Sequence, residues 1–109
     1  MSFKYIYMNF ILASVDEILQ QLGERLRAQR LAQALPQHEL AAMAGLSLGA
    51  VRKLENSGRS SLETLVRVTQ ALGLVEELQP LFALKRQSIA EMEQAAQARR
   101  QRAPRRPRR

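Results

Sequence analysis

Residues 35–56, LPQHELAAMAGLSLGAVRKLEN, contain the pattern that decides the fold. Pro36 suits the start of a helix over 37–44, and Gly45 ends that helix because glycine readily takes the left-handed backbone of helix C-termini. Ser47 can cap the next helix through its hydroxyl oxygen. The apolar residues expected to hold the two helices together at a steep angle are Leu40, Leu46, Val51 and Leu54.

Two short helices joined by such a turn form a helix-turn-helix motif, whose second helix enters the major groove of DNA. Ala41 fits this arrangement because its small side chain lets the second helix pass close above it. Val51 and Leu54 turn one face of the second helix towards the core. The opposite face is basic and polar and carries Leu48, Gly49, Arg52, Lys53 and Asn56.

Helical patterns continue on both sides of the motif. Ser14 and Glu17 have the spacing of a capping box and open a helix that runs to about 30–31. Ser60 and Glu63 have the same spacing and open a helix that ends at the next glycine. The inward residues expected are Val15, Ile18, Leu19, Leu22 and Leu26 in the first of these helices and Leu62, Leu65, Val66, Thr69 and Leu72 in the second.

Two more helices are expected towards the C-terminus. One covers 75–82 and is distorted by Pro80, and the other covers 89–102 and begins with a capping box of Ser88 and Glu91. The predicted fold is therefore all-α. The chain divides into a strand-like arm (1–13), a helix-turn-helix domain (14–82), a helical extension (83–98) and an Arg/Pro-rich tail (99–109).

The N-terminal residues 3–12, FKYIYMNFIL, differ from the helical body because they are rich in β-branched and aromatic side chains. They predict a strand. A lone strand leaves its backbone groups without partners, so we expect it to pair with the same strand of a second subunit or with a partner protein. The alternative is that translation starts at Met8 rather than Met1.

The net charge of +7 is concentrated at the C-terminus. Seven of the 17 Lys and Arg residues lie in 99–109, and the other ten balance the ten Asp and Glu residues. Pro104 and Pro107 interrupt any helix there, and no large apolar side chain is present, so we expect this tail to be disordered when free. Its charge points to an anionic partner.

Several classes of protein are excluded by what the sequence lacks. The chain has no cysteine and a single histidine, His38, which argues against a metal site. No apolar run reaches the length of a membrane span, and no phosphate loop, nucleophile elbow or paired carboxylates are recognisable. We therefore expect a cytoplasmic, nucleoid-associated protein that is not an enzyme and has no cofactor, no membrane partner and no small-molecule substrate.

Over about residues 22–82 the sequence resembles the Xre or lambda-repressor-like family. The residues that match the family pattern are Gln37, Glu39, Leu40, Ala41, Gly45, Val51, Leu54, Glu55 and Asn56. The resemblance implies a five-helix DNA-binding domain in which Arg30 and Glu55 form a salt bridge between helices. Residues 60–74, SSLETLVRVTQALGL, further resemble HipB-type antitoxins. That likeness implies an autorepressor that binds a palindromic operator as a homodimer and a HipA-like kinase toxin as its partner.

By motif position, the side chains expected at base edges are Ser47, Leu48, Gly49, Arg52 and Lys53. Those expected at phosphates are Gln37, Ser47, Asn56, Arg59 and Ser60. Arg52 is the best base reader because its planar fork can bind O6 and N7 of guanine together. Lys53 can equally contact a phosphate. Leu48, Gly49 and Pro36 depart from the polar residues common at these places, which leaves fewer direct contacts to DNA.

Three other functions fit parts of the sequence. A solitary or phage-type regulator would share the domain but lack the toxin. An interaction protein would keep the fold without reading DNA, and would use the tail or the helix over 89–102 to hold a partner. A nucleoid or RNA-binding protein would depend on the charge of the tail.

Overall fold

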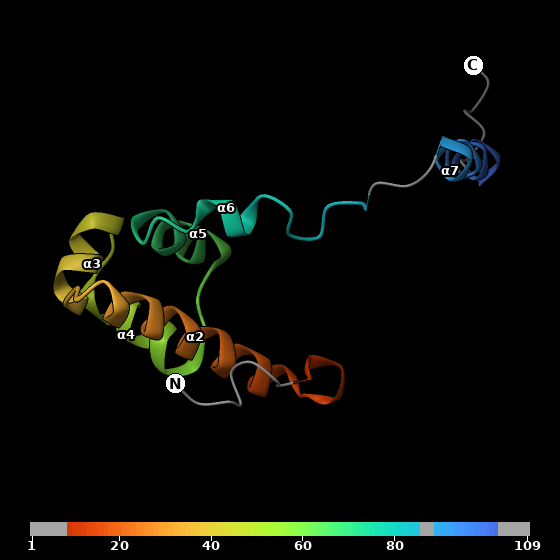
Figure 1. Ribbon diagram of the computed structural model, residues 1–109. Coiled ribbons are helices and arrows are strands. Elements are labelled where there is room, and N and C mark those ends of the chain that lie inside the picture. The colour runs from red at the N-terminus through yellow and green to blue at the C-terminus, as the bar shows by residue number, and fades with distance from the viewer. Residues whose placement is uncertain (1–8, 86–88, 103–109) are drawn as a thin grey trace, which may run out of the picture.

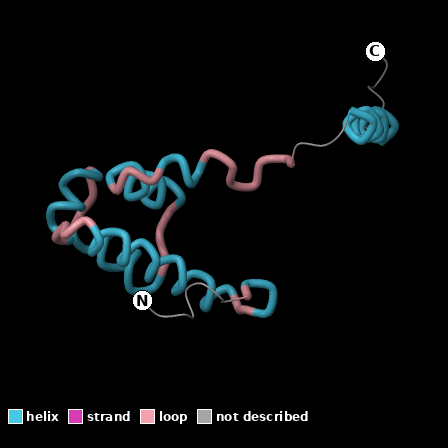
Figure 2. The backbone as a smooth tube through the Cα atoms, viewed as in Figure 1, coloured by secondary structure: helices cyan, strands magenta, loops and turns pink. Residues whose placement is uncertain are grey.

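A computed structural model describes residues 9–85 and 89–102 (Figure 1). Within these ranges the regular structure is entirely helical, and Figure 2 shows helices joined by loops. The elements are a 3-10 helix, η1 (Phe10–Leu12), and six α-helices, α2 (Val15–Ala32), α3 (Gln37–Ala44), α4 (Leu48–Ser57), α5 (Leu62–Ala71), α6 (Val75–Leu78) and α7 (Ile89–Arg102). None of the helices in the described part of the chain is both long and apolar enough to cross a membrane.

The central helices begin and end where the sequence predicts. Ser14 and Glu17 form the expected capping box at the start of α2, with the Glu17 carboxylate accepting from the Ser14 amide at 2.8 Å. Ser47 caps α4 by accepting from the amide of Ala50 at 3.1 Å. Gly45 ends α3 with φ +70°, the left-handed conformation for which glycine was expected. The predicted caps of α2 and α4 and the predicted end of α3 are therefore confirmed.

The start of α5 differs from the prediction. Ser61, not Ser60, is the cap, and its hydroxyl oxygen accepts from the amide of Thr64 at 3.0 Å. The prediction that Leu62 points inward is also wrong, because its side chain is 76% exposed. Leu62 shares a face with Thr69, seven residues later, but it lies in the first turn of α5, where solvent reaches it. Val68 is the core residue that the predicted stripe omitted.

The part of the N-terminal arm that directly precedes α2 is helical and not a strand. Phe10–Leu12 form the 3-10 helix η1, and residues 3–8 of the predicted strand lie outside the described residues. Asn9 caps η1 by accepting from the amide of Ile11 at 2.9 Å. The Phe10 ring lies 5.0 Å from the guanidinium of Arg25, so a capped turn and an aromatic contact with α2 replace extended structure here.

The helix expected over 75–82 is shorter than predicted. The structure has α6 over Val75–Leu78 and turns from there to Phe82. Pro80 has no amide hydrogen to donate, which removes a bond that a continuing helix needs. Helix α7 occupies the range expected for it and lies apart from the other helices in Figure 1, while its expected cap, Ser88, is outside the described residues. Residues 99–102 belong to α7, so the prediction of a disordered tail is wrong for them, and the rest of that tail lies outside the described residues.

The hydrophobic core lies where α3, α4 and α5 meet. Leu40, Val51 and Val68, one from each of these helices, are completely or almost completely buried. Ala41, Leu54 and Leu72 complete the cluster, and Leu26, Leu35 and Leu46 pack against it. The core residues predicted in the helix-turn-helix segment are therefore confirmed. They hold α4 by one face and leave its other face outside.

Helix α2 packs on α4 through its backbone more than through an apolar stripe. A Cβ atom at Gly23 would lie 2.4 Å from the carbonyl oxygen of Leu54, and one at Gly58 would lie 1.9 Å from that of Leu19. The two helices come so close that no larger residue fits at either glycine. Gly23 is buried in this contact, whereas Val15 is 72% and Leu22 is 37% exposed, so the predicted inward stripe of α2 is wrong at these two residues.

Candidate nucleic-acid interface

The α3–α4 turn sets the direction of the candidate reading helix. The amide of Leu46 donates to the carbonyl of Ala41 at 2.9 Å, directly after the left-handed Gly45. Arg67 of α5 donates to the carbonyl of Ala44 at 3.5 Å, at the end of α3. Hydrogen bonds from both sides thus fix the path by which the chain leaves α3 and enters α4.

The two faces of α4 have different roles. Val51, Leu54 and Glu55 are buried, and they attach the helix to the rest of the domain. Arg52 and Lys53, between them in sequence, are exposed. Because a helix turns by about 100° per residue, these positions alternate between core and solvent. The outer face of α4 is therefore basic, and the buried face holds the helix firmly against the core.

The residues expected at base edges lie along this outer face and its first turn. Ser47 and Gly49 are exposed, and Leu48 is half-buried. The hydroxyl oxygen of Ser47 is used as the helix cap, which leaves its hydrogen available to an acceptor. A Cβ atom at Gly49 would meet only Ser47 Oγ, at 3.9 Å, so the surface there is open to a close approach. Arg52 and Lys53 supply the two charged groups.

The residues expected at phosphates are more scattered. Asn56 is exposed at the end of α4, and the hydroxyl of Ser60 donates to the carbonyl of Ser61 at 2.9 Å. Arg59 forms an exposed ion pair with Asp16 in the first turn of α2. Gln37 is half-buried and lies against α4. The structure thus brings Gln37 beside α4, while the guanidinium of Arg59 is paired with an acidic side chain.

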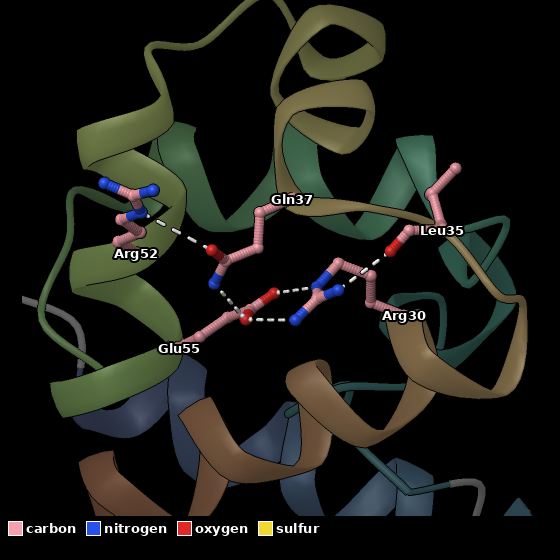
Figure 3. Close-up of polar contacts among 5 residues, drawn as sticks. All are labelled: Arg30, Leu35, Gln37, Arg52 and Glu55. Carbon is pink, nitrogen blue, oxygen red and sulfur yellow. Dashed lines mark hydrogen bonds and ion pairs between the residues drawn. The ribbon is translucent and has the colours of Figure 1, made fainter.

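Arg30 and Glu55 form a buried ion pair beneath this surface (Figure 3). Arg30 Nε donates to Glu55 Oε2 at 2.7 Å and Nη2 donates to Oε1 at 3.0 Å. The remaining Nη1 of Arg30 donates to the carbonyl of Leu35 at 2.8 Å. The two side chains are only 7% and 1% exposed, so the pair links α2, α4 and the loop before α3 inside the domain.

Gln37 connects the buried pair to the exposed face of α4. Its Nε2 donates to Glu55 Oε1 at 2.9 Å, and its Oε1 accepts from Arg52 Nε at 3.5 Å (Figure 3). Sequence reasoning placed Gln37 and Arg52 in separate roles and missed this contact. It also missed Gly23 and Gly58, although a glycine inside a strong helical pattern such as that of Gly23 is a known sign of close packing.

Across the described residues there is no group of three or more His, Cys, Asp or Glu side chains that could hold a metal ion. His38 is exposed on α3. The positively charged groups on α4 are thus the main chemical feature of this surface, and they suit an anionic polymer.

Comparison with known proteins agrees with this geometry. Residues 26–78 match the model of a family described as Helix-turn-helix, and no curated protein shows a significant match to the sequence. The matched range includes α3 and α4 with the core that supports them. Residues 26–78 therefore form a helix-turn-helix domain, which indicates a DNA-binding transcription regulator.

Proposed function

We propose that this protein is a sequence-specific transcriptional repressor that reads duplex DNA with α4. The observation that carries the proposal is the division of α4 into two faces. Val51, Leu54 and Glu55 hold one face in the core, so Arg52 and Lys53 project from the other on a rigid helix. A major groove accepts a helix held in this way, and a rigid support keeps base contacts in one register.

Arg52 is the principal base reader in this proposal. Its guanidinium can donate to O6 and N7 of one guanine, which the single ammonium of Lys53 cannot do. Ser47, Leu48, Gly49 and Lys53 complete the surface that faces the bases. Phosphates are contacted by Gln37 at the start of α3, by Ser47 at the start of α4, and by Asn56, Arg59 and Ser60 after it.

The repressor acts as a homodimer on a palindromic operator, because one reading helix spans too few base pairs to define a site. The apolar side chains of Val75, Leu81, Phe82 and Leu84 support a dimer surface around α6, since all four are exposed in the single chain. Burying them against a second copy would remove a large apolar area from water. The Arg-rich residues 99–109 add charge attraction to phosphates that flank the operator.

The finer proposal is a HipB-like antitoxin that represses its own promoter and binds a HipA-like kinase toxin. Its support is the likeness of residues 60–74 to that subfamily. In a solitary regulator the same domain would act without the toxin. Co-purification with a kinase-like protein encoded beside the gene supports the antitoxin role, and a gene with no such neighbour contradicts it.

The test of the repressor function is selection of duplexes from a random-sequence pool by the full chain. We expect one palindromic sequence to be enriched, and Arg52→Ala to relax the preference at one base pair in each half-site. Arg59→Ala is the matched control: it removes an equal charge from the loop after α4 and weakens binding to all duplexes alike. A wild-type protein that enriches no sequence contradicts the proposal.

A further inference from the structure

We propose that the side chain of Gln37 is a positioning residue that aims Arg52 at its base and so sets the specificity of the domain. The inference rests on the proposed function, because it concerns how Arg52 reads DNA. It follows from a chain of contacts that begins at the buried pair and ends on the exposed face of α4 (Figure 3).

The first step is that Glu55 is fixed. The residue is 2% exposed, and both of its carboxylate oxygens accept from Arg30. Arg30 is itself fixed by its third hydrogen bond, to the carbonyl of Leu35. A carboxylate bound in this way by two parallel hydrogen bonds cannot rotate without losing at least one of them. Glu55 is therefore a rigid acceptor beneath α3.

The second step is that Glu55 determines which way the amide of Gln37 points. An ionised carboxylate only accepts hydrogen bonds, so the amide must turn its Nε2 group, which donates, towards Glu55. The reverse orientation would place two oxygens against each other at about hydrogen-bond distance and leave a half-buried acceptor unpaired. Gln37 Oε1 is consequently directed outward, towards Arg52.

The third step concerns Arg52. Its Nε lies 3.5 Å from Gln37 Oε1, a long hydrogen bond that can shorten when water is excluded by DNA. In Figure 3 a single dashed line joins Arg52 to Gln37, and it starts at Nε. With Nε held, Nη1 and Nη2 remain as a fork that matches O6 and N7 of guanine. An unsupported, exposed arginine would sample many rotamers, including some that reach only phosphates.

This orientation also limits what the Gln37 side chain can do at a phosphate. Its outward atom is an oxygen, which cannot donate to a phosphate oxygen. The backbone amide of Gln37 lies at the start of α3, where phosphate binding is favoured, so that contact is compatible with the positioning role. The side chain thus acts on base choice and the backbone on anchoring.

The test is a double-mutant cycle with Gln37→Met and Arg52→Ala. Methionine keeps the length of the side chain but removes both polar groups. Two duplexes are used: the sequence selected by the wild-type protein, and the same duplex changed at the base pair where Arg52→Ala loses its preference. The measured quantity is the ratio of the two dissociation constants. A partly unfolded variant lowers binding to both duplexes equally, so loss of folded protein cancels in this ratio.

We expect the wild-type ratio to be about tenfold, within the range for a paired arginine–guanine contact, and Gln37→Met to reduce it to about threefold or less. In the Arg52→Ala background, Gln37→Met should leave the ratio unchanged. Gln29→Met, the same substitution at an exposed position of α2, is the control, and it should preserve the ratio at this base pair. Equal loss of affinity for both duplexes, with the same factor in either background, would show a phosphate ligand and overturn the positioning role. A wild-type protein with no preferred duplex would instead refute the repressor function itself.

Discussion

The α2–α4 contact and the segment that follows α5 differ in how far each is packed within the single chain. Between α2 and α4 the backbones touch at Gly23 and Gly58, and the Arg30–Glu55 pair is sealed between them. After α5, Phe82 and Leu84 are 93% and 92% exposed, and Val75 and Leu81 are also in water. The first region is complete within one chain, whereas the second presents the kind of surface that another molecule covers.

The largest effect is expected where the buried pair is broken. Arg30→Met leaves the Glu55 carboxylate buried without its cation, and we expect a loss of about 3–5 kcal/mol in the free energy of unfolding. Urea denaturation measures this loss. The matched control is Arg67→Met, which breaks the exposed pair of Arg67 with Glu63 on α5 together with its long, 3.5 Å hydrogen bond to the Ala44 carbonyl, and should still cost less than about 1 kcal/mol.

A chain that does not fold with Arg30→Met can still be tested by combining it with Glu55→Leu. Replacing both charges by apolar groups removes the unpaired carboxylate, so folding should be recovered. Equal, small losses for Arg30→Met and Arg67→Met would contradict the contrast between a sealed contact and an exposed one.

The next largest loss of stability is expected at Gly58, and a comparison with Gly73 separates the cost of a steric clash from the cost of left-handed backbone strain. Gly58 and Gly73 both have φ +75°, but a Cβ atom would strike the Leu19 backbone at the first and would meet nothing within 4 Å at the second. We expect Gly58→Ala to destabilise the domain by about 3 kcal/mol and Gly73→Ala by about 1 kcal/mol, since only the first adds a clash to the left-handed strain. Thermal unfolding of the two variants provides the comparison, and similar values would mean that α2 and α4 can move apart at little cost.

Substitutions in the segment after α5 should change the stability of the single chain little but should clearly weaken its association into a dimer. Because Phe82 and Leu84 are exposed, Phe82→Ser and Leu84→Ser should change the stability of the monomer by no more than about 0.5 kcal/mol. Each should weaken the proposed dimer at least about tenfold, as the loss of one buried apolar side chain requires. Sedimentation measures the dimer. Leu62, which is 76% exposed on α5, is the control. A dimer weakened only by Leu62→Ser would show that the interface lies on α5 instead.

The smallest expected effect is a gain in the free energy of unfolding. Ala34 has φ +55° in the loop between α2 and α3, a conformation that strains any residue with a Cβ atom. Ala34→Gly should therefore stabilise the domain by about 0.5–1 kcal/mol. Ala28→Gly, on the exposed side of α2, should instead destabilise it by about 1 kcal/mol because glycine lowers helix propensity there. A loss at both positions in denaturant titrations would show that the Ala34 turn carries no strain.

The sequence predicted the parts of the fold that depend on neighbouring residues. The Ser14 and Ser47 caps, the left-handed Gly45 and the core face of α4 follow from residues within a few positions of one another, and the structure confirms them. The prediction failed at Ser60, where two adjacent serines offer the same cap and only the register of α5 in the core selects Ser61. It failed at Val15 because spacing shows which residues share a face and not whether another helix covers that face.

The sequence by itself determined the helical body of the domain, with a basic helix behind a glycine turn, because periodicity, caps and charge are local properties of the amino acids. Tertiary structure alone decided how closely α2 approaches α4 and which way the Gln37 amide points. Both depend on atoms far apart in the chain: the Leu19 carbonyl at Gly58, and the Arg30–Glu55 pair beneath Gln37. Hydrogen bonds and close contacts of this kind require exact distances, which helical spacing cannot supply.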